Sequence, residues 1–467
     1  MNSNIILNLL KPLILEQGKI DIKGIDDVGV RLEKAKPNQV VFYNLKGDKK
    51  SQELFKSRLG EKSNFLIILS QRPTAMVLEK NFLVIPQDKF LPAQKIICDH
   101  FFPLKRQSFK LIGITGTNGK STTAYLGMFI STLLGHSALS VGTLGIDSFT
   151  DKVGDTDNTT PSYVDLRKIL FTYQNDYKAF FLEVSSHSLD QNRLYDLRLD
   201  GGIFTSFSQD HLDYHSSMEE YFKSKEKMAK EYFDQKASLV IPKGEELLRE
   251  KLLEAKVAKT LEERGIKNIP HIFKIPYNKR NLECALEINE IIWNDFKPVD
   301  IFKLKNPKGR FSSISYKDSF IVIDYAHTPQ ALERVLGSIK SIYPDFKVSV
   351  VFGCGGDRDT LKRPIMGKIA SDFVTSGKIY LTSDNPRSEK PEKIIDDIKK
   401  GIDKHNFEVI PDRKMAIETA ISNIKEKEIL LIAGKGHEDY QEIKGVCHPF
   451  SDFKIVEEFL DGKKNSI

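Results

Sequence analysis

Short apolar runs alternate with polar segments along the whole chain, and this alternation predicts an α/β protein. In the first hundred residues lysine-rich turns separate the runs, and we expect strands at 39–44, 64–69 and 82–85. From residue 108 the alternation becomes regular, with predicted strands at 109–114, 138–141, 179–184, 202–207 and 238–241. A second regular series follows, at 319–323, 347–352, 378–381 and 428–433. Because helical segments separate these runs, doubly wound, mostly parallel sheets are predicted.

This rhythm divides the chain into three predicted domains. Residues 1–107 form a small α/β domain, 108–304 a central domain of the P-loop ATPase type with a mostly parallel sheet, and 305–467 a C-terminal Rossmann-like domain. A length of 467 residues suffices for about three domains, each with its own core. Within the central domain, the lysine- and glutamate-rich segment 243–268 predicts a solvated helix, and 276–288 predicts the last helix.

Polar residues directly follow several of the predicted strands. Ser185 and His187 follow one strand of the central domain, and His211 follows the next. Asp384 and Arg387 follow a strand of the C-terminal domain in the same way. In open parallel sheets ligands bind outside the carboxyl ends of the strands. Two such sheets predict one active site between two domains.

One segment, GITGTNGKSTT, lies between a predicted strand and a predicted helix. Gly116 and Gly119 let backbone N–H groups approach phosphate oxygens, while Lys120 adds a positive charge and Ser121 offers a hydroxyl to Mg²⁺. The general phosphate-loop pattern fails, because Ile114 stands where it requires a glycine. What remains is a tighter variant, TGTNGK followed by serine, and it predicts a nucleotide-binding loop.

Two further side chains are candidate metal ligands. Glu183 ends an otherwise apolar strand, where an unpaired carboxylate is costly and should be paired, solvated or bound to a metal. His211 follows another strand of the same sheet. Together with the hydroxyl of Ser121 they form a reasonable ligand set for Mg²⁺ on nucleotide phosphates. From the residues alone, a purely structural role stays open for both.

Two arginines follow strands of the C-terminal domain, in loops stiffened by glycine or proline. Arg358 belongs to the stretch GCGGDRD and Arg387 to DNPR. A guanidinium in such a loop suits bidentate capture of a carboxylate or phosphate. The alternative for either residue is a surface ion pair.

Composition narrows the class of protein. The chain is 40% apolar and 29% charged, as in globular proteins. Its net charge of +6 comes from 70 Lys and Arg interleaved with 64 Asp and Glu, which suits small anionic substrates better than nucleic acid. The four cysteines show neither disulfide nor zinc spacing. Since no segment resembles a signal peptide or a membrane span, we expect a cytoplasmic monomer without membrane or nucleic-acid partners.

Eight motifs follow one another in the order GITGTNGKSTT, NTTP, EVSSHSLDQNR, DHLDYH, DYAHTP, GCGGDRD, DNPR and GKGHE. As a set, between residues 109 and 453, they resemble the Mur ligase family. The resemblance implies an ATP-dependent amide ligase of peptidoglycan synthesis, with uridine-, ATP- and amino-acid-binding domains. It also implies that a substrate carboxylate attacks the γ-phosphate of ATP. The acyl phosphate so formed is then displaced by an amine through a tetrahedral intermediate.

The resemblance also implies residue roles. ATP is expected to contact Gly116, Thr117, Asn118, Gly119, Lys120, Ser121, Thr122, Asn278, Asn281, Arg310 and Asp324. UDP-N-acetylmuramoyl-L-alanyl-D-glutamate is expected to contact Asn158, Thr159, Thr160, Ser185, Gln191 and Arg193. The incoming amino acid is expected to contact Arg358, Asp384, Asn385, Pro386, Arg387, Gly434 and Glu438. The implied metal ligands are Ser121, Glu183, His211 and Lys225, and the implied catalytic residues are Lys120, Glu183, His211 and Lys225.

Lys225 is expected to be carbamylated. A neutral amine that captures CO₂ becomes an anionic oxygen ligand for Mg²⁺. Composition alone predicts a solvated helix face for the segment FKSKEKMAKEYF, which holds four lysines. Only the resemblance selects Lys225 among them.

The motif DNPR bears on the choice of amino acid. Members of the family that add meso-diaminopimelate resemble this chain in having this arginine, which binds the second carboxylate that lysine lacks. Arg387 therefore predicts meso-diaminopimelate rather than L-lysine, since an unpaired Arg387 would cost several kcal/mol.

The chain departs from the family pattern in three places. The stretch RLEKAKPN, from Arg31, replaces the usual DSR and Pro-Gly of the uridine-binding domain, so no uridine contacts are assigned. Ser312 replaces a usual glutamate, and Ser188 a usual glycine. None of these changes touches the ATP residues.

Three alternatives remain open. The first is a related ligase for L-lysine, another amino acid or a peptide. The second is a nucleotide-binding regulator without ligase activity, against which the intact Lys120, Glu183, His211 and Lys225 argue. The third is a motor or transporter ATPase, which the missing general loop pattern and the amino-acid motifs disfavour.

Overall fold

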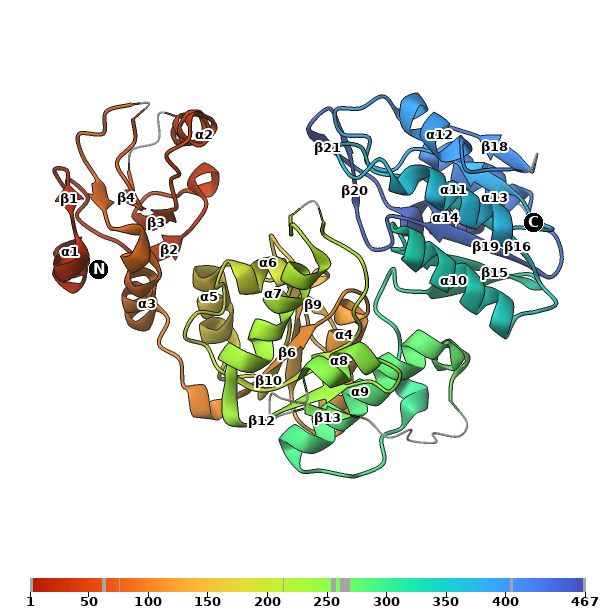
Figure 1. Cartoon of the computed structure of the whole chain (residues 1–467), viewed down its shortest axis with the longest axis horizontal. Coiled ribbons are helices and arrows are strands. Elements are labelled where there is room, and N and C mark those ends of the chain that lie inside the picture. The colour runs from red at the N-terminus through yellow and green to blue at the C-terminus, as the bar shows by residue number, and fades with distance from the viewer. Residues whose placement is uncertain are drawn as a thin grey trace.

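The computed structural model describes residues 3–60, 64–74, 76–212, 214–252, 258–260, 269–403 and 406–464. Three α/β domains follow one another along the chain, and each is built on its own sheet (Figure 1). The first domain, in red and orange, and the third, in teal and blue, lie at the upper left and the upper right of the central domain (Figure 1). The predicted three-domain α/β fold is confirmed, whereas its boundaries after residues 107 and 304 stay predictions.

The first domain is built on five strands in the order β1-β5-β4-β3-β2, of which only β1 is antiparallel. The strands are β1 (Glu16–Gln17), β2 (Asp27–Gly29), β3 (Gln39–Tyr43), β4 (Leu66–Leu69) and β5 (Phe82–Val84). The helices are α1 (Ser3–Leu10), α2 (Lys49–Leu59) and α3 (Phe90–Phe101). The three strands predicted here are confirmed as β3, β4 and β5.

The central domain holds eight strands in the order β13-β12-β11-β6-β10-β7-β8-β9, of which only β8 runs antiparallel to its neighbours. The strands are β6 (Lys110–Thr115), β7 (Ala138–Gly142), β8 (Gly145–Asp147), β9 (Lys152–Gly154), β10 (Ala179–Glu183), β11 (Leu199–Phe204), β12 (Phe233–Ile241) and β13 (Ala258–Thr260). The helices are α4 (Lys120–Leu133), α5 (Tyr163–Tyr173), α6 (Ser186–Asp190), α7 (Met218–Glu231), α8 (Glu246–Leu252) and α9 (Pro276–Trp293).

Strand β10 shows why this sheet is doubly wound. Its side chains alternate between two cores, because successive residues of a strand point to opposite faces. Phe180 and Leu182 pack in the core that includes α5 and α7, and Phe181 packs in the core that includes α4 and α9. Since β6 lies between β10 and β11, the phosphate loop after β6 and Glu183 at the end of β10 share one edge of the sheet.

The third domain holds six strands in the order β14-β15-β19-β16-β17-β18, of which only β14 is antiparallel. The strands are β14 (Ser312–Tyr316), β15 (Ser319–Asp324), β16 (Lys347–Phe352), β17 (Ile379–Leu381), β18 (Phe407–Val409) and β19 (Glu428–Ala433). A separate hairpin joins β20 (Tyr440–Ile443) to β21 (Val446–Pro449). The helices are α10 (Pro329–Ile342), α11 (Lys362–Phe373), α12 (Pro391–Lys399), α13 (Arg413–Ser422) and α14 (Asp452–Lys464).

Two predictions are corrected. The segment 243–268 is not one solvated helix, because β13 extends the sheet beside β12; parts of this segment lie outside the described residues. The strand predicted at 202–207 runs earlier, as β11 over Leu199–Phe204. Directly after it, the hydroxyl of Thr205 donates to the carbonyl of Asn118 of the phosphate loop. The hairpin of β20 and β21 was not predicted at all.

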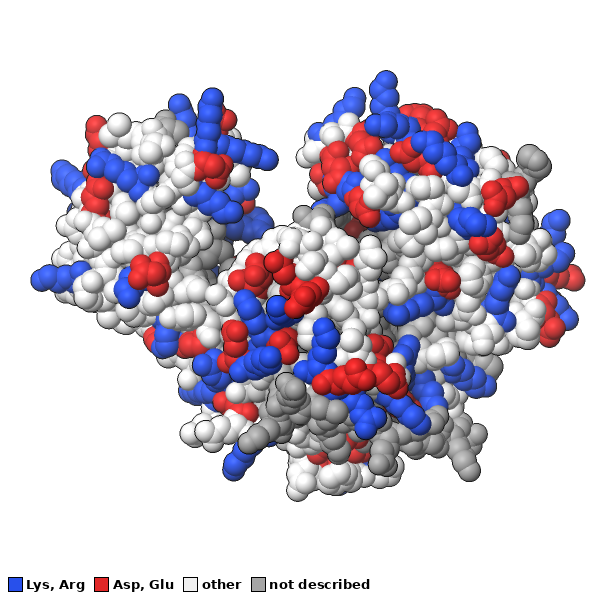
Figure 2. Space-filling view, in the orientation of Figure 1, with Lys and Arg blue, Asp and Glu red and all other residues white. Residues whose placement is uncertain are grey.

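Figure 2 shows basic and acidic side chains interspersed over the visible face, with no large area of a single sign. An open notch separates the first and third domains above the central one (Figure 2). Within the described part of the chain, no helix combines the length and the apolar character needed to cross a membrane.

Candidate active site

The phosphate loop connects β6 to α4, as predicted. Gly116 and Gly119 have φ values of 140° and 89°, which side chains other than glycine rarely adopt. A Cβ at Gly116 would lie 2.0 Å from the hydroxyl oxygen of Thr205, and one at Gly119 would lie 2.7 Å from Oδ1 of Asn281. The loop therefore needs both glycines for its conformation and for the close approach of its neighbours.

Two lysines converge on one carbonyl of this loop. Lys120 donates to the carbonyls of Gly116 and Thr117, at 2.9 and 2.8 Å. Lys225, from α7, also donates to the carbonyl of Gly116, at 2.9 Å. Burial lowers the pKa of Lys120, and burial together with the charge of Lys120 lowers the pKa of Lys225 well below its ordinary value. The predicted solvated face is therefore wrong for Lys225, which is only 1% exposed.

Glu183 is paired rather than isolated. Its Oε2 accepts a hydrogen bond from the Ser121 hydroxyl at 3.0 Å, and its Oε1 accepts one from the backbone N–H of Thr143 at 2.8 Å. Strand β7 comes close enough for this bond only because it ends in Gly142, where a Cβ would lie 2.1 Å from Oε1. The carboxylate and the phosphate-loop serine thus form one unit.

His211 is placed next to the same loop by aromatic contacts. Its ring lies 5.8 Å from that of Tyr221, whose hydroxyl is 3.2 Å from the Thr117 hydroxyl. The ammonium of Lys225 lies 4.7 Å from the centre of the Tyr221 ring. His211, Lys225 and the phosphate loop therefore share one neighbourhood.

The donor set fits a hard cation such as Mg²⁺. In the described ranges no three His, Cys, Asp or Glu side chains converge on one point. Mg²⁺ does not need such a cage, since it commonly binds one or two carboxylates, substrate phosphates and water. Glu183 and Ser121 already lie together beside the phosphate loop and supply oxygen donors. Their role as metal ligands, with His211 and Lys225, stays a prediction.

The residues predicted for the adenosine side come from both domains. Asn278 and Asn281 are buried in the first turns of α9, and Asn281 packs against Gly119 of the phosphate loop. Asp324 ends β15 and accepts a hydrogen bond from the backbone N–H of Phe311 at 2.7 Å. Burial raises its pKa to about 6. Arg310 stacks over Tyr325, with its guanidinium carbon 4.5 Å from the centre of the ring.

One hydrogen bond joins the two halves of this site. Nη2 of Arg310, from the third domain, donates to the Ser121 hydroxyl at 3.2 Å. The same hydroxyl donates to Glu183. Arginine, serine and carboxylate therefore form a chain from the third domain to the end of β10.

The residues predicted to contact the UDP-linked substrate form a second connected group. Thr160 donates to the Glu183 carbonyl at 2.8 Å and accepts from the backbone N–H of Ser185 at 3.0 Å. Arg193 donates to the Thr160 carbonyl at 2.7 Å and to the side-chain oxygen of Gln191 at 2.8 Å. This network begins at the same strand end as the metal-binding candidate Glu183.

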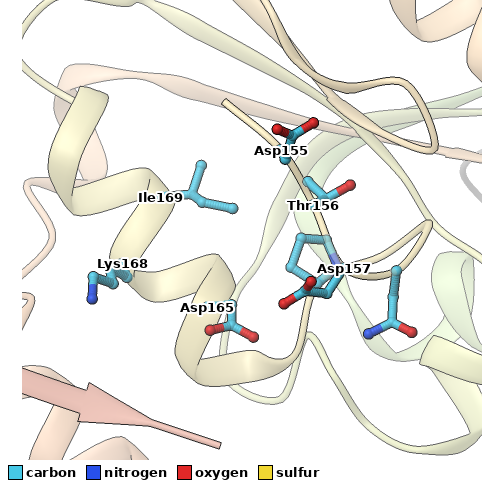
Figure 3. A pocket seen from close by; sticks show the side chains of 8 residues that line it. Asp155, Thr156, Asp157, Asp165, Lys168 and Ile169 are labelled. Atoms are coloured by element: carbon cyan, nitrogen blue, oxygen red, sulfur yellow. The ribbon is translucent and has the colours of Figure 1, made fainter. Parts of the chain in front are cut away.

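The loop before α5 extends this group toward the first domain. Thr159 accepts a hydrogen bond from the Thr143 hydroxyl at 3.1 Å. Asn158 lines a cavity of about 160 Å³ between this loop and α5 (Figure 3). Asp157, at the same cavity, pairs with Arg31 and Lys34 of the first domain at 3.1 and 2.9 Å. The altered stretch of the first domain therefore contacts the substrate side of the central domain.

Arg387 is held rigidly in the third domain. Its Nε donates to Glu442 of β20 at 3.0 Å, and its Nη1 donates to the Gly356 carbonyl at 2.8 Å. Among the described residues nothing accepts from Nη2. The guanidinium is thus fixed on one side and can bind an anion on the other.

A buried polar cluster follows Arg387. Asn385 donates to Glu438 at 3.0 Å, and Lys435 donates to both, at 2.8 and 3.0 Å. Lys435 also lies 3.5 Å from Asp384. A Cβ at Gly434 would lie 2.7 Å from the Asp384 carboxylate, so Gly434 borders the same cluster.

The two remaining candidates lie beside Gly356 and Gly355. A Cβ at Gly356 would lie 2.0 Å from the Pro386 carbonyl, so Pro386 packs directly on this loop. Arg358 is exposed, and its Cγ would lie 3.8 Å from a Cβ at Gly355. Among the amino-acid candidates, Arg358 is thus the one whose side chain is not held in the cluster.

Three residues of the site were missed from the sequence: Thr143, Lys435 and Glu442. Thr143 and Lys435 each directly follow a glycine at the end of a buried strand, a position that could have identified them. Glu442 gave no such signal, because the hairpin that carries it was not predicted.

Comparison with known proteins places this site in a family. The chain matches the Mur ligase middle domain over residues 114–284, and the glutamate ligase domain of Mur ligases over 309–436. The UDP-N-acetylmuramoyl-L-alanyl-D-glutamate--2,6-diaminopimelate ligase of Aquifex aeolicus is 36% identical over 90% of this chain and 91% of its own. The ligase of the same name from Rickettsia bellii is 37% identical over 82% and 89%.

A solved structure agrees with these relatives. A UDP-N-acetylmuramoyl-L-alanyl-D-glutamate--2,6-diaminopimelate ligase superposes with a TM-score of 0.58 and 28% identity, over 95% of this chain and 96% of its own. The similarity thus spans all three domains, including the first, which neither family model matches. The chain belongs to the Mur ligase family.

Proposed function

We propose that this protein is an ATP-dependent ligase that joins meso-diaminopimelate to UDP-N-acetylmuramoyl-L-alanyl-D-glutamate in peptidoglycan precursor synthesis. Relatives that span most of the chain carry this activity in their names. The observation that supports it best is the geometry of Arg387, whose Nε and Nη1 are bound while Nη2 is open to a carboxylate. Diaminopimelate has a second carboxylate that L-lysine lacks, so this arginine favours the former.

The chemistry brings two anions together. The D-glutamyl carboxylate attacks the γ-phosphorus of ATP, and the bond from this phosphorus to the β,γ-bridging oxygen breaks. ADP is the leaving group, and the carboxylate becomes an acyl phosphate. Lys120 and the backbone N–H groups of the loop oppose the repulsion between carboxylate and phosphate. Mg²⁺, held by Ser121 and Glu183, would offset the remaining negative charge on the phosphates.

The second half of the reaction forms the amide. The amine of the incoming amino acid attacks the acyl carbon and loses a proton, and inorganic phosphate leaves. Arg387 is proposed to hold the distal carboxylate, while the carboxylates of Asp384 and Glu438 hold the distal ammonium and Asn385 orients Glu438 beside it. This anchoring orients the reacting amine toward the acyl phosphate and supplies the entropic part of catalysis.

We also propose that Lys225 is carbamylated and acts as an anionic ligand. Carbamylation requires a neutral amine, and the burial and neighbouring charge that lower the pKa of Lys225 supply one. The anionic carbamate would also lie close to Lys120, which binds the same Gly116 carbonyl, and the two opposite charges would attract each other. We further propose that the protein works as a monomer in the cytoplasm, where its nucleotide substrates are made.

Phosphate release tests this proposal. Purified protein is given Mg-ATP, UDP-N-acetylmuramoyl-L-alanyl-D-glutamate and bicarbonate, with meso-diaminopimelate, L-lysine or no amino acid. We expect release that depends on meso-diaminopimelate, with a preference over L-lysine that R387M abolishes. Release with L-lysine alone would establish the other ligase, and ATP hydrolysis that ignores both amino acids would contradict ligation.

A further inference from the structure

Lys435 is a buried cation at the amino-acid end of the site, and no step described above uses it. It lies in the loop after β19, and its side chain is 0% exposed. Because the ammonium has no access to solvent, it does not touch an incoming substrate. Any effect it has on the reaction must pass through the residues it binds.

The contacts of Lys435 fix the orientation of one amide. Its Nζ donates to Oδ1 of Asn385 at 2.8 Å, and the backbone N–H of Glu442 donates to the same oxygen at 3.0 Å. The amide nitrogen of Asn385 then donates to Oε2 of Glu438 at 3.0 Å. A flipped amide would set its NH₂ group against two donors, so this arrangement permits a single orientation.

The same ammonium sets the charge of the cluster. Glu438 and Asp384 are both anionic, and Lys435 lies 3.0 and 3.5 Å from them. The neighbouring Arg413 forms an ion pair with Asp452 at 2.8 Å, which balances its charge, and both of these side chains are 0% exposed. Two carboxylates and one ammonium leave a single uncompensated negative charge, which complements one substrate ammonium.

We infer that Lys435 is a positioning residue for amino-acid selection: through Asn385, Glu438 and Asp384 it builds a pocket wall that binds the distal ammonium of a diamino acid. This inference rests on the proposed function. Glu442 of the β20–β21 hairpin also holds Arg387, and Arg387 binds the distal carboxylate beside this ammonium. The two halves together recognise an amino acid whose far end carries both charges.

The test compares K435M with K435R in the full-length enzyme. Methionine keeps roughly the length of the side chain but removes the ammonium that lies between Asp384 and the partly exposed Glu438. We expect K435M to raise KM for meso-diaminopimelate at least roughly tenfold, with KM for ATP within about twofold of wild type. K435R keeps a buried cation, and we expect a smaller rise.

Lys444 supplies the matched control. It lies in the turn of the same hairpin with an exposed side chain, so K444M removes the same charge close by without touching the cluster. The inference would be overturned if K435M left KM for meso-diaminopimelate unchanged, or if K444M changed it equally. Either result would leave the proposed ligase activity intact. A parallel loss of nucleotide affinity in K435M would show that Lys435 only supports the fold. If wild type itself shows no release dependent on meso-diaminopimelate, the proposed function fails first.

Discussion

At the scale of single residues, burial decides the chemistry of the charged groups in this site. Lys120 and Lys225 lie on one carbonyl, where neither is well solvated, and the loss of solvation lowers the pKa of both amines. Asp324 is affected in the opposite direction, since burial disfavours its charged form. The pKa values of these groups therefore depend on their burial and their neighbours and not on residue type alone.

Replacing Lys225 tests its proposed role as a carbamate. We expect K225A and K225R each to lower kcat by roughly 100-fold, because neither side chain can form an anionic ligand. The measurement is phosphate release at saturating substrates, with nucleotide affinity as a check on folding.

The control is K223A, two positions away on α7, where the side chain is 65% exposed and pairs with Glu219. Its kcat should stay near wild type. Full activity in K225R would rule out a carbamate at this position.

The carboxyl of Asp324 predicts a dependence of stability on pH. Its pKa is about 6 in the folded protein against 3.8 ordinarily, so the folded state binds the additional proton between these values. The stability this contributes is fully present below pH 3.8 and is lost as the pH rises through about 6. Over this window the free energy of unfolding of wild type should therefore fall by up to roughly 3 kcal/mol more than that of D324N.

Urea unfolding of wild type and D324N at pH 4.5 and 7.5 measures this effect. For each protein, the free energy of unfolding at pH 7.5 is subtracted from that at pH 4.5, and the two differences are compared. Contributions from the other carboxylates cancel in this comparison because both proteins contain them. Parallel changes in both proteins would show that Asp324 does not titrate in this range.

At the scale of elements, parallel strands bring the reacting groups together by ending at one edge. The phosphate loop follows β6 and Glu183 ends β10, while Thr143, directly after β7, adds its backbone N–H. In the third domain Gly356, in the loop after β16, and Glu442, in the β20–β21 hairpin, hold Arg387 between them. Few of these contacts are local in sequence, so the order of strands in the sheets creates them.

The close approach of β7 and β10 gives a test at this scale. In G142A the new Cβ would lie 2.1 Å from Oε1 of Glu183, so the carboxylate must move away from Ser121 and Thr143. Displacing it by about 1 Å should lower kcat roughly 100-fold. Steady-state phosphate release measures the change.

Gly337 offers a control for the same substitution. It lies inside α10, where the nearest atom to an added Cβ is 3.6 Å away. We expect G337A to keep its activity and to gain slightly in stability, since alanine is the better helix former. A wild-type kcat in G142A would show that the reaction does not depend on the position of the Glu183 carboxylate.

At the scale of the whole molecule, the proposed reaction needs groups from two domains. Lys120, Ser121 and Glu183 lie in the central domain, whereas Arg387 and the Lys435 cluster lie in the third. Arg310 already reaches across to Ser121 at 3.2 Å. On the other side, Arg31 and Lys34 link the first domain to Asp157.

We expect the domains to move closer when substrates bind. The notch between the first and third domains leaves room for such motion (Figure 2), and the acyl phosphate must be brought to the amino acid and shielded from water. Small-angle scattering should show a smaller radius of gyration with a nonhydrolysable ATP analogue and the UDP-linked substrate together than with either alone. An unchanged radius would mean that the site is assembled without domain motion.

The sequence by itself determined the fold class and the main candidates, because their signals are local. Parallel strands buried on both faces appear as short apolar runs, and the glycines, Lys120 and Ser121 of the phosphate loop are contiguous. Family motifs selected Lys225 and Arg387, which periodicity could not distinguish from surface residues. The same local reasoning failed in the segment 243–268, where the many lysines and glutamates predicted a solvated helix although the segment contains strand β13.

Only the tertiary structure decided which groups touch. The bond of Lys225 to the Gly116 carbonyl, the bond of Thr143 to Glu183 and the bond of Lys435 to Asn385 each join residues from different parts of the chain. A pattern along one strand or helix records which side of that element is apolar, but it does not record the neighbour that packs against it. Desolvation and hydrogen bonding depend on that neighbour, and they determine the protonation, orientation and chemistry of this site.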